Sequence, residues 1–236
     1  MQVQAQTSSQ ASPRIDSAAL RRTAMDCQIR PYGVTDQPLL ARFLDVPREV
    51  FAPAGQEALT YSDAELRHPL DGGKGARPML MPLVLARLLQ AAEISPRDSV
   101  LDVAGAAGYT AALLAGVAAK VVALESDAAL SAAAAANFAT LGLTNATAVC
   151  GPLRAGAAAK GPFDVVVVNG AVEEGLDHLL AQLAPAGRLV ALEPQTSGAA
   201  KAVLYRKDGS NFSKRAVLEG AGKLLPDFAK APGFTF

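Results

Sequence analysis

The chain has 236 residues, half of them hydrophobic and 19% charged, with 22 basic residues against 22 acidic ones. This balance excludes disorder of the whole chain, and the length favours one domain with extensions. A formal net charge of zero, without a run of five basic residues, argues against nucleic acid as a partner. No window approaches the roughly 18 consecutive apolar residues of a membrane span, so we expect a soluble protein.

The N-terminal third predicts a tail followed by a helical extension. Residues 1–15 are polar and lack the apolar stretch of a secretory signal, so we expect a disordered tail on a cytoplasmic protein. Residues 16–44 carry apolar residues at helical spacing, interrupted at Pro31-Tyr32-Gly33, which predicts two helices joined by a turn. Residues 47–82 are rich in proline and glycine, which predicts a long loop that contacts substrate or acts as a lid.

Residues 83–236 alternate predicted strands with predicted helices and form the expected core. Residues 16–82 are an N-terminal extension of this core, and we expect the two parts to form one domain. The strands are continuous apolar runs, as expected when helices cover both faces of a parallel sheet. A turn signal at residues 207–210 predicts an antiparallel hairpin at one sheet edge. The fold class is therefore α/β, a Rossmann-like doubly wound sheet, mostly parallel, with an antiparallel edge hairpin and an N-terminal helical extension. The predicted helices are 82–92, 109–116, 128–141 and 175–183, and the predicted strands are 99–103, 120–125, 146–150, 163–168, 188–192, 201–206 and 212–217.

The cysteines and histidines indicate no metal or nucleophile site. Cys27 and Cys150 lie far apart with no neighbour at ligand spacing, so we expect reduced thiols in the cytosol, Cys150 as a small core residue. His68 and His178 adjoin no serine or cysteine nucleophile motif. Phe234 and Phe236 are expected to pack on the body of the protein.

In an open parallel sheet, ligands bind beyond the carboxyl ends of the strands. Asp102 lies near the end of the first core strand, residues 99–103, which leads into a turn of small residues that opens a helix, with Gly105 and Gly108 in the turn. The second strand ends at Glu125, placed to accept hydrogen bonds from ribose hydroxyls, although a solvated strand-end acid is the simpler alternative. Asp102 could instead cap the turn, and Asn169 could cap the turn after the fourth strand or face a methyl donor.

Four ordered blocks resemble the protein-L-isoaspartate O-methyltransferases, a branch of the S-adenosylmethionine-dependent methyltransferases of Rossmann-like fold. The first block, VPREVFAP, is similar to the family's VPRexFvP, and the second, VLDVAGAAGYTAALLA, to VLeiGtGsGYqaAvLA. The third is GPFD followed by VVVVNGA, and the fourth, QLAPAGRLV, is similar to QLkpGGrLV. The blocks are residues 46–53, 100–115, 161–171 and 182–190.

The resemblance implies transfer of a methyl group from S-adenosylmethionine to the carboxylate of an isoaspartyl residue in a damaged protein or peptide. Such a carboxylate is ionised at neutral pH and is itself the nucleophile, so no catalytic base and no metal are expected. The implied cofactor-binding residues are Asp102, Ala104, Gly105, Gly108, Glu125, Ser126 and Asn169.

The chain departs from the family pattern around this site. Ala104 and Ala106 replace glycines, Pro152 stands where the family usually carries an aspartate for the adenine, and Leu80 occupies the serine position of the substrate loop. Backbone amides or Arg77 are the remaining candidates for aligning the substrate carboxylate. Two alternatives stay open: a binding or regulatory module that has lost the cofactor, and a methyltransferase acting on another carboxylate or a small molecule.

Overall fold

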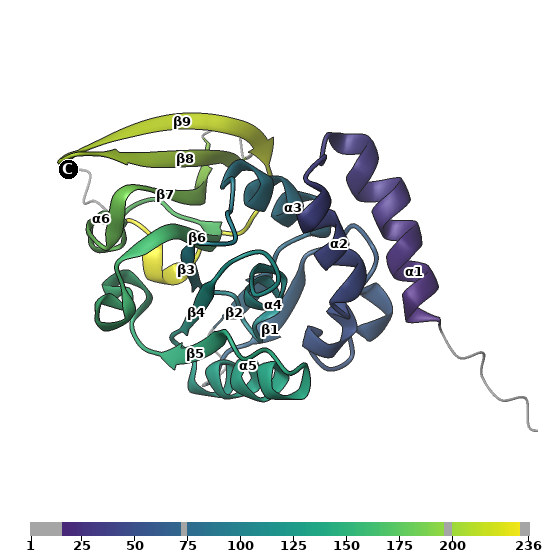
Figure 1. Ribbon diagram of the computed structural model, residues 1–236. Helices are drawn as coiled ribbons and strands as arrows, with labels where there is room; N and C mark the ends of the chain where they lie inside the picture. The colour runs from purple at the N-terminus through teal and green to yellow at the C-terminus, as the bar shows by residue number, and fades with distance from the viewer. Residues whose placement is uncertain (1–15, 72–74, 196–199, 232–236) are drawn as a thin grey trace, which may run out of the picture.

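The computed structural model describes residues 16–71, 75–195 and 200–231 (Figure 1). The predicted tail and the predicted packing of Phe234 and Phe236 lie outside these residues. Among the described residues, no helix is both long enough and apolar enough to cross a membrane. The same part of the chain contains no group of three or more His, Cys, Asp or Glu side chains that could hold a metal ion.

A seven-stranded sheet in the order β5-β4-β3-β6-β7-β8-β9 forms the centre of the molecule. The first five strands of this order are parallel, and β8 and β9 pair antiparallel as a hairpin on β7. The predicted fold class is confirmed. The strands are β3 (Ser99–Val103), β4 (Lys120–Glu125), β5 (Ala146–Cys150), β6 (Phe163–Ala171), β7 (Leu183–Pro194), β8 (Ala200–Asp208) and β9 (Asn211–Gly220).

Helices and loops cover both faces of the sheet, which explains the apolar runs. In β6, Val165 and Val167 pack into one apolar cluster, and Val166 and Val168 into the cluster on the other face. Figure 1 shows α2, α3 and α4 on one side of the sheet and α6 on the other. The helices are α1 (Ser17–Ala24), α2 (Gln37–Asp45), α3 (Pro82–Ala91), α4 (Tyr109–Leu114), α5 (Ala128–Thr140) and α6 (Asp177–Ala181).

The helix that follows β4 begins where its sequence dictates. The carboxylate of Asp127 accepts a hydrogen bond of 3.0 Å from the Leu130 amide and caps α5. The capping residue follows Glu125, the last residue of β4, by two positions, so α5 begins directly beyond the carboxyl end of this strand.

The prediction of a long loop at residues 47–82 is wrong in part, because this segment contains two short strands. Leu66–Pro69 forms β1 and Ala76–Met79 forms β2, and they pair antiparallel as a separate two-stranded sheet. In β1, Leu66 and His68 are buried while Arg67 and Pro69 are exposed. Four residues are too few for this alternation to indicate a strand in the sequence, and the hairpin depends on packing against the core.

The predicted burial of Cys150 is also wrong. Cys150 is exposed, because it is the last residue of β5, an edge strand in which no residue is fully buried. Both Cys150 and Cys27 are free thiols on the surface.

Candidate functional site

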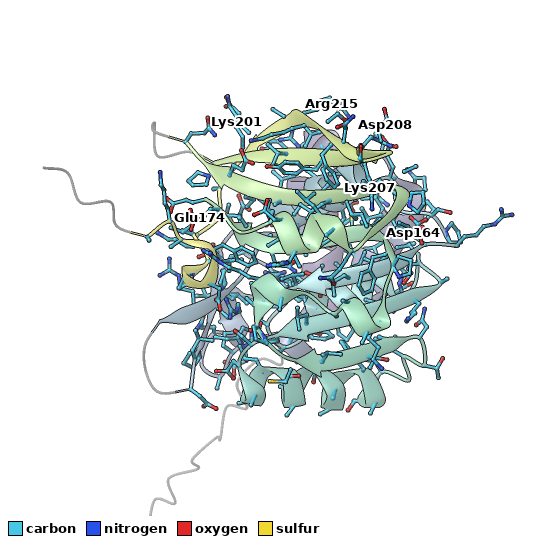
Figure 2. The ribbon with its side chains drawn as sticks, turned by 90° about the vertical axis from the view of Figure 1, so that its left-hand side faces the viewer. Asp164, Glu174, Lys201, Lys207, Asp208 and Arg215 are labelled. Carbon is cyan, nitrogen blue, oxygen red and sulfur yellow. The ribbon has the colours of Figure 1, made fainter. Side chains whose placement is uncertain are left out.

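The residues expected to bind a ligand gather at the carboxyl ends of β3, β4 and β6. Figure 2 shows Asp164, near the start of β6, and Glu174, beyond its end, on opposite sides of the molecule, so these carboxyl ends face the side of Glu174. The parallel register places Val103 beside Leu124 and Val168. Asp102, Glu125 and Asn169 consequently lie around the end of β3, as the sequence predicted.

The turn after β3 has a backbone that suits glycine, yet two alanines occupy it. Ala104 and Ala106 have φ angles of +60° and +54°, in the left-handed region that penalises side chains with a Cβ. A Cβ at Gly105 would lie 2.4 Å from Oδ2 of Asp102. Gly108, with φ of +94°, begins α4, and a Cβ there would meet the ring of Phe138 at 2.6 Å. The close packing of this turn therefore requires both remaining glycines.

Asp102 is fully buried and joined to β6. Its Oδ1 accepts a 2.6 Å hydrogen bond from Nδ2 of Asn169, which also donates to the Val103 carbonyl at 2.9 Å. The Thr110 hydroxyl donates to Oδ1 of Asn169 at 2.7 Å. Asn169 therefore ties β6 to β3 and α4 rather than capping the turn that follows it.

The second oxygen of Asp102 has no hydrogen-bond partner among the described residues, although it is buried. Burial raises the pKa of Asp102 to about 7, although the hydrogen bond from Asn169 lowers this pKa. The nearby charge of Glu125 raises this pKa further. A buried acceptor without a donor is costly for the fold alone, which makes this oxygen a candidate contact for a ligand.

Glu125 is only 2% exposed, so its interpretation as a solvated strand-end acid is wrong. Its Oε1 accepts hydrogen bonds from the Ser126 amide at 2.8 Å and from Nε of Arg77 at 3.0 Å. Its Oε2 accepts from the Ala106 amide at 3.3 Å. Burial raises the pKa of Glu125, and the charge of Arg77 acts in the opposite direction.

Arg77, in β2, contacts this carboxylate directly and is 1% exposed. Its Nη2 lies 2.9 Å from Oε1 of Glu125 and donates to the hydroxyl of Ser126 at 2.9 Å. Its Nη1 lies 3.2 Å from Oδ2 of Asp227. In the structure the guanidinium of Arg77 therefore binds Glu125. From the sequence, Arg77 was a candidate for aligning a substrate carboxylate.

Asp227 contacts the candidate site through Arg77, and the sequence did not indicate it. It lies 150 positions from Arg77 in the chain, within the single-turn helix Pro226–Phe228, and no local motif surrounds it. Only the folding of the C-terminal segment over the end of β6 brings the two residues together.

The two other departures from the family motifs lie at the margin of this site. Pro152 is exposed and precedes the short helix Leu153–Ala155 after β5. The side chain of Leu80 is 2% exposed and belongs to the apolar core, while its carbonyl accepts a 2.9 Å hydrogen bond from Arg48. An apolar core contact therefore replaces a hydroxyl at this position.

The acceptors of the site suit a nucleoside with vicinal hydroxyls, since the Glu125 carboxylate and the unpartnered Oδ2 of Asp102 lie beside a closely packed small-residue turn. The conformation is nevertheless closed. The five residues Asp102, Ala104, Ala106, Glu125 and Asn169 each expose 2% or less of their surface. Any ligand must therefore displace side chains before it reaches Glu125.

Comparisons with known proteins give one consistent result. Residues 20–219 match the family described as protein-L-isoaspartate(D-aspartate) O-methyltransferase. The protein-L-isoaspartate O-methyltransferase of Koribacter versatilis is 39% identical over 181 residues, which cover 76% of this chain and 79% of the relative. The enzyme of the same name from Methylorubrum extorquens is 35% identical over 203 residues, covering 86% of both chains.

Two solved structures share the architecture. A protein-L-isoaspartate O-methyltransferase matches with a TM-score of 0.76 and 26% identity, over 87% of this chain and 65% of that chain. A Plasmodium falciparum homologue in complex with S-adenosyl-L-homocysteine matches with a TM-score of 0.68 and 17% identity, over 89% of this chain and 98% of that chain. At that identity the second likeness supports the fold alone.

Proposed function

Because the chain belongs to the protein-L-isoaspartate(D-aspartate) O-methyltransferase family, we propose that it is an S-adenosylmethionine-dependent carboxyl methyltransferase acting on isoaspartyl residues of damaged proteins. The family resemblance predicted from the four sequence blocks is confirmed. The observation that carries the proposal in the structure is the buried carboxylate of Glu125 at the end of β4, 3.3 Å from a backbone amide of the small-residue turn.

The reaction requires the protein mainly to align the carboxylate with the methyl donor. An isoaspartyl carboxylate is ionised at neutral pH and can attack the methyl group without a general base. S-adenosylmethionine, when bound, supplies an electrophilic methyl group. The protein's contribution is to hold the two reactants at a productive distance and to exclude water, which can account for a large part of the rate enhancement.

We assign the cofactor to the residues at the strand ends. Glu125 would accept hydrogen bonds from the ribose hydroxyls, and the turn at Ala104, Gly105 and Gly108 would approach the ligand with its backbone. Ser126 would border the nucleoside side of the site. Asp102, with its unpartnered Oδ2, and Asn169, which positions Asp102, complete the proposed set.

The proposed partner is a protein or peptide that contains an isoaspartyl residue. Leu80 presents no hydroxyl at the family's serine position, so we expect methyl transfer to be slow relative to the family. The free thiols of Cys27 and Cys150 support a reducing, cytoplasmic location.

Labelled methanol released after ester hydrolysis tests this proposal, with an isoaspartyl peptide and the same peptide carrying ordinary aspartate. Release from the isoaspartyl peptide alone is expected. Glu125→Gln should weaken binding of S-adenosylhomocysteine by about 1 to 3 kcal/mol, the range for losing a hydrogen bond to a charged group, as measured by calorimetry. Asp98→Asn, at the opposite end of the sheet, is the control whose affinity should not change.

The structure also favours a second candidate, a binding module that retains the fold without catalysis. Its support is the engagement of Glu125 by Arg77, which leaves the proposed ribose acceptor already paired. This candidate predicts no release of methanol from either peptide at saturating S-adenosylmethionine. Methylation of a different carboxylate would instead appear as release with another substrate and none with the isoaspartyl peptide.

A further inference from the structure

The C-terminal segment, residues 223–229, seals the carboxyl end of β6. The Ala171 amide donates to the Lys223 carbonyl at 2.8 Å, and the Leu225 amide donates back to the Ala171 carbonyl at 2.9 Å. Leu225 and Phe228 are fully buried in the apolar cluster on the α6 face of the sheet. The segment is therefore anchored by both its backbone and its side chains.

Arg77 connects this segment to the candidate cofactor site. One guanidinium, held in β2, contacts Glu125 at the end of β4 and Asp227 in the C-terminal segment. Three elements that are distant in the sequence thus meet at a single buried cation. We call Arg77 together with residues 223–229 the latch.

The latch and a ribose would compete for Oε1 of Glu125. Oε1 of Glu125 already receives Nε and Nη2 of Arg77 and the Ser126 amide, which uses its acceptor capacity. Oε2 faces the Ala106 amide. Oε2 retains room for one further donor, but a pair of ribose hydroxyls that binds one to each oxygen needs Oε1 as well, and Oε1 becomes available only when the guanidinium withdraws.

The two halves of the latch differ in exposure. The side chains of Arg77 and Glu125 are 1% and 3% exposed, whereas that of Asp227 is 31% exposed. Solvent screens the outer ion pair more strongly than the inner one, so the outer pair is the weaker. Opening would therefore begin when Arg77 and Asp227 separate.

We propose that the latch holds the cofactor site closed and that S-adenosylmethionine binds only after Arg77 leaves Glu125. This inference rests on the proposed function, since it concerns access to the same site. The apparent affinity for the cofactor is then the intrinsic affinity reduced by the fraction of molecules that are open. A variant that weakens the latch without touching Glu125 should bind the cofactor more tightly.

The test compares Asp227→Asn and Arg77→Gln with the wild-type protein and with Asp98→Asn. The control breaks a different ion pair, in which Nη2 of Arg188 lies 2.6 Å from Oδ2 of Asp98. Calorimetry with S-adenosylhomocysteine measures affinity without requiring turnover. Asp227→Asn should raise affinity by about twofold to fivefold, and Asp98→Asn should leave it unchanged.

Hydrogen exchange gives a second readout that needs no ligand. The Leu225 and Phe228 amides should exchange about twofold to fivefold faster in Asp227→Asn than in the wild type, since weaker closure exposes the segment more often. Arg77→Gln should raise both exchange and affinity further. If Arg77→Gln does not fold, the latch is tested with Asp227→Asn alone. This variant should fold, because the Asp227 side chain is partly exposed.

Unchanged affinity in the latch variants, or an unchanged exchange rate of the C-terminal amides in Asp227→Asn, would overturn the latch. The proposed function is judged separately from methanol release by the wild-type protein. Release from the isoaspartyl peptide with no gain of affinity in the variants would reject the latch and keep the function. Tighter binding by Asp227→Asn without release from any form would support the latch and reject the function.

Discussion

The two ends of the sheet each contain an arginine paired with a carboxylate, Arg77 fully buried and Arg188 partly buried, and the pairs differ in their surroundings. At the amino end, Arg188 contacts Asp98, whose Oδ2 also accepts a 2.8 Å hydrogen bond from the Ser95 amide. The same guanidinium donates to the Ala92 and Glu93 carbonyls at the end of α3. This pair completes the hydrogen bonding of a helix end and a strand start.

At the carboxyl end, the Arg77–Glu125 pair lies beside features that cost stability. Ala104 and Ala106 hold left-handed backbone angles, and Asp102 buries an oxygen without a partner among the described residues. Strain and buried charge of this kind concentrate at functional sites, where the surrounding fold compensates for them. The comparison therefore separates an ion pair that completes a helix end from one that lies beside strained backbone and an unpartnered buried oxygen.

The largest expected effect comes from removing one partner of the inner pair. Arg77→Met should lower the free energy of unfolding by about 3 to 5 kcal/mol, because Glu125 is left buried without a counter-charge. Arg188→Met, at the less buried amino-end pair, should cost about 1.5 to 3 kcal/mol, the range for lost hydrogen bonds to a charged group. Urea denaturation of both variants measures the difference.

A double variant sharpens this prediction. Arg77→Met combined with Glu125→Gln removes the uncompensated charge, so it should be more stable than Arg77→Met alone. Equal stability of the single and double variants would show that lost packing, not buried charge, dominates at this end of the sheet.

The second effect concerns pH and Asp102. Its folded-state pKa of about 7 lies above the ordinary value of 3.8, so between these values the folded state binds a proton that the unfolded state has lost. This contribution to stability is present at low pH and is lost as the pH rises toward 7, by up to about 1.4 kcal/mol per pH unit.

Asp102→Asn removes the titrating group and retains an acceptor for Asn169. The stability of this variant relative to the wild type should increase by about 2 kcal/mol between pH 5 and pH 8. Thermal or urea unfolding at several pH values gives the comparison. A difference that stays constant over this range would mean that Asp102 is charged in the folded protein throughout.

The smallest effect is expected in the turn. Ala104→Gly and Ala106→Gly each remove the steric strain of an alanine in the left-handed region, which costs about 1 to 2 kcal/mol. Glycine in turn loses more chain entropy on folding, which costs about 0.5 to 1 kcal/mol. Each variant should therefore gain roughly 0.5 to 1 kcal/mol of stability. Ala135→Gly, on the exposed side of α5, is the matched control and should lose about 1 kcal/mol. Loss of stability in the turn variants would mean that the alanine methyls contribute packing that outweighs the strain.

Much of the fold could be predicted because it depends on local pattern. The bounds of β3, β4 and β5 match the sequence prediction, since each is a run of residues that suits burial or pairing and ends at a turn. β6 and β7 are longer than predicted, because their ends are extended by pairing with neighbouring strands, including a bridge between Ala171 and Leu224. Strand ends depend on partners as well as on composition.

The sequence by itself determined that Asp102, Glu125 and Asn169 would meet, because parallel strands bring their carboxyl ends to one edge of a sheet. It also determined the family, through four blocks in order. Only the tertiary structure decided that Arg77 lies on Glu125 and that Asp227 completes the pair. Contacts across 150 residues leave no local periodicity in a sequence, because burial and charge pairing at such a distance are chosen by packing of the whole chain.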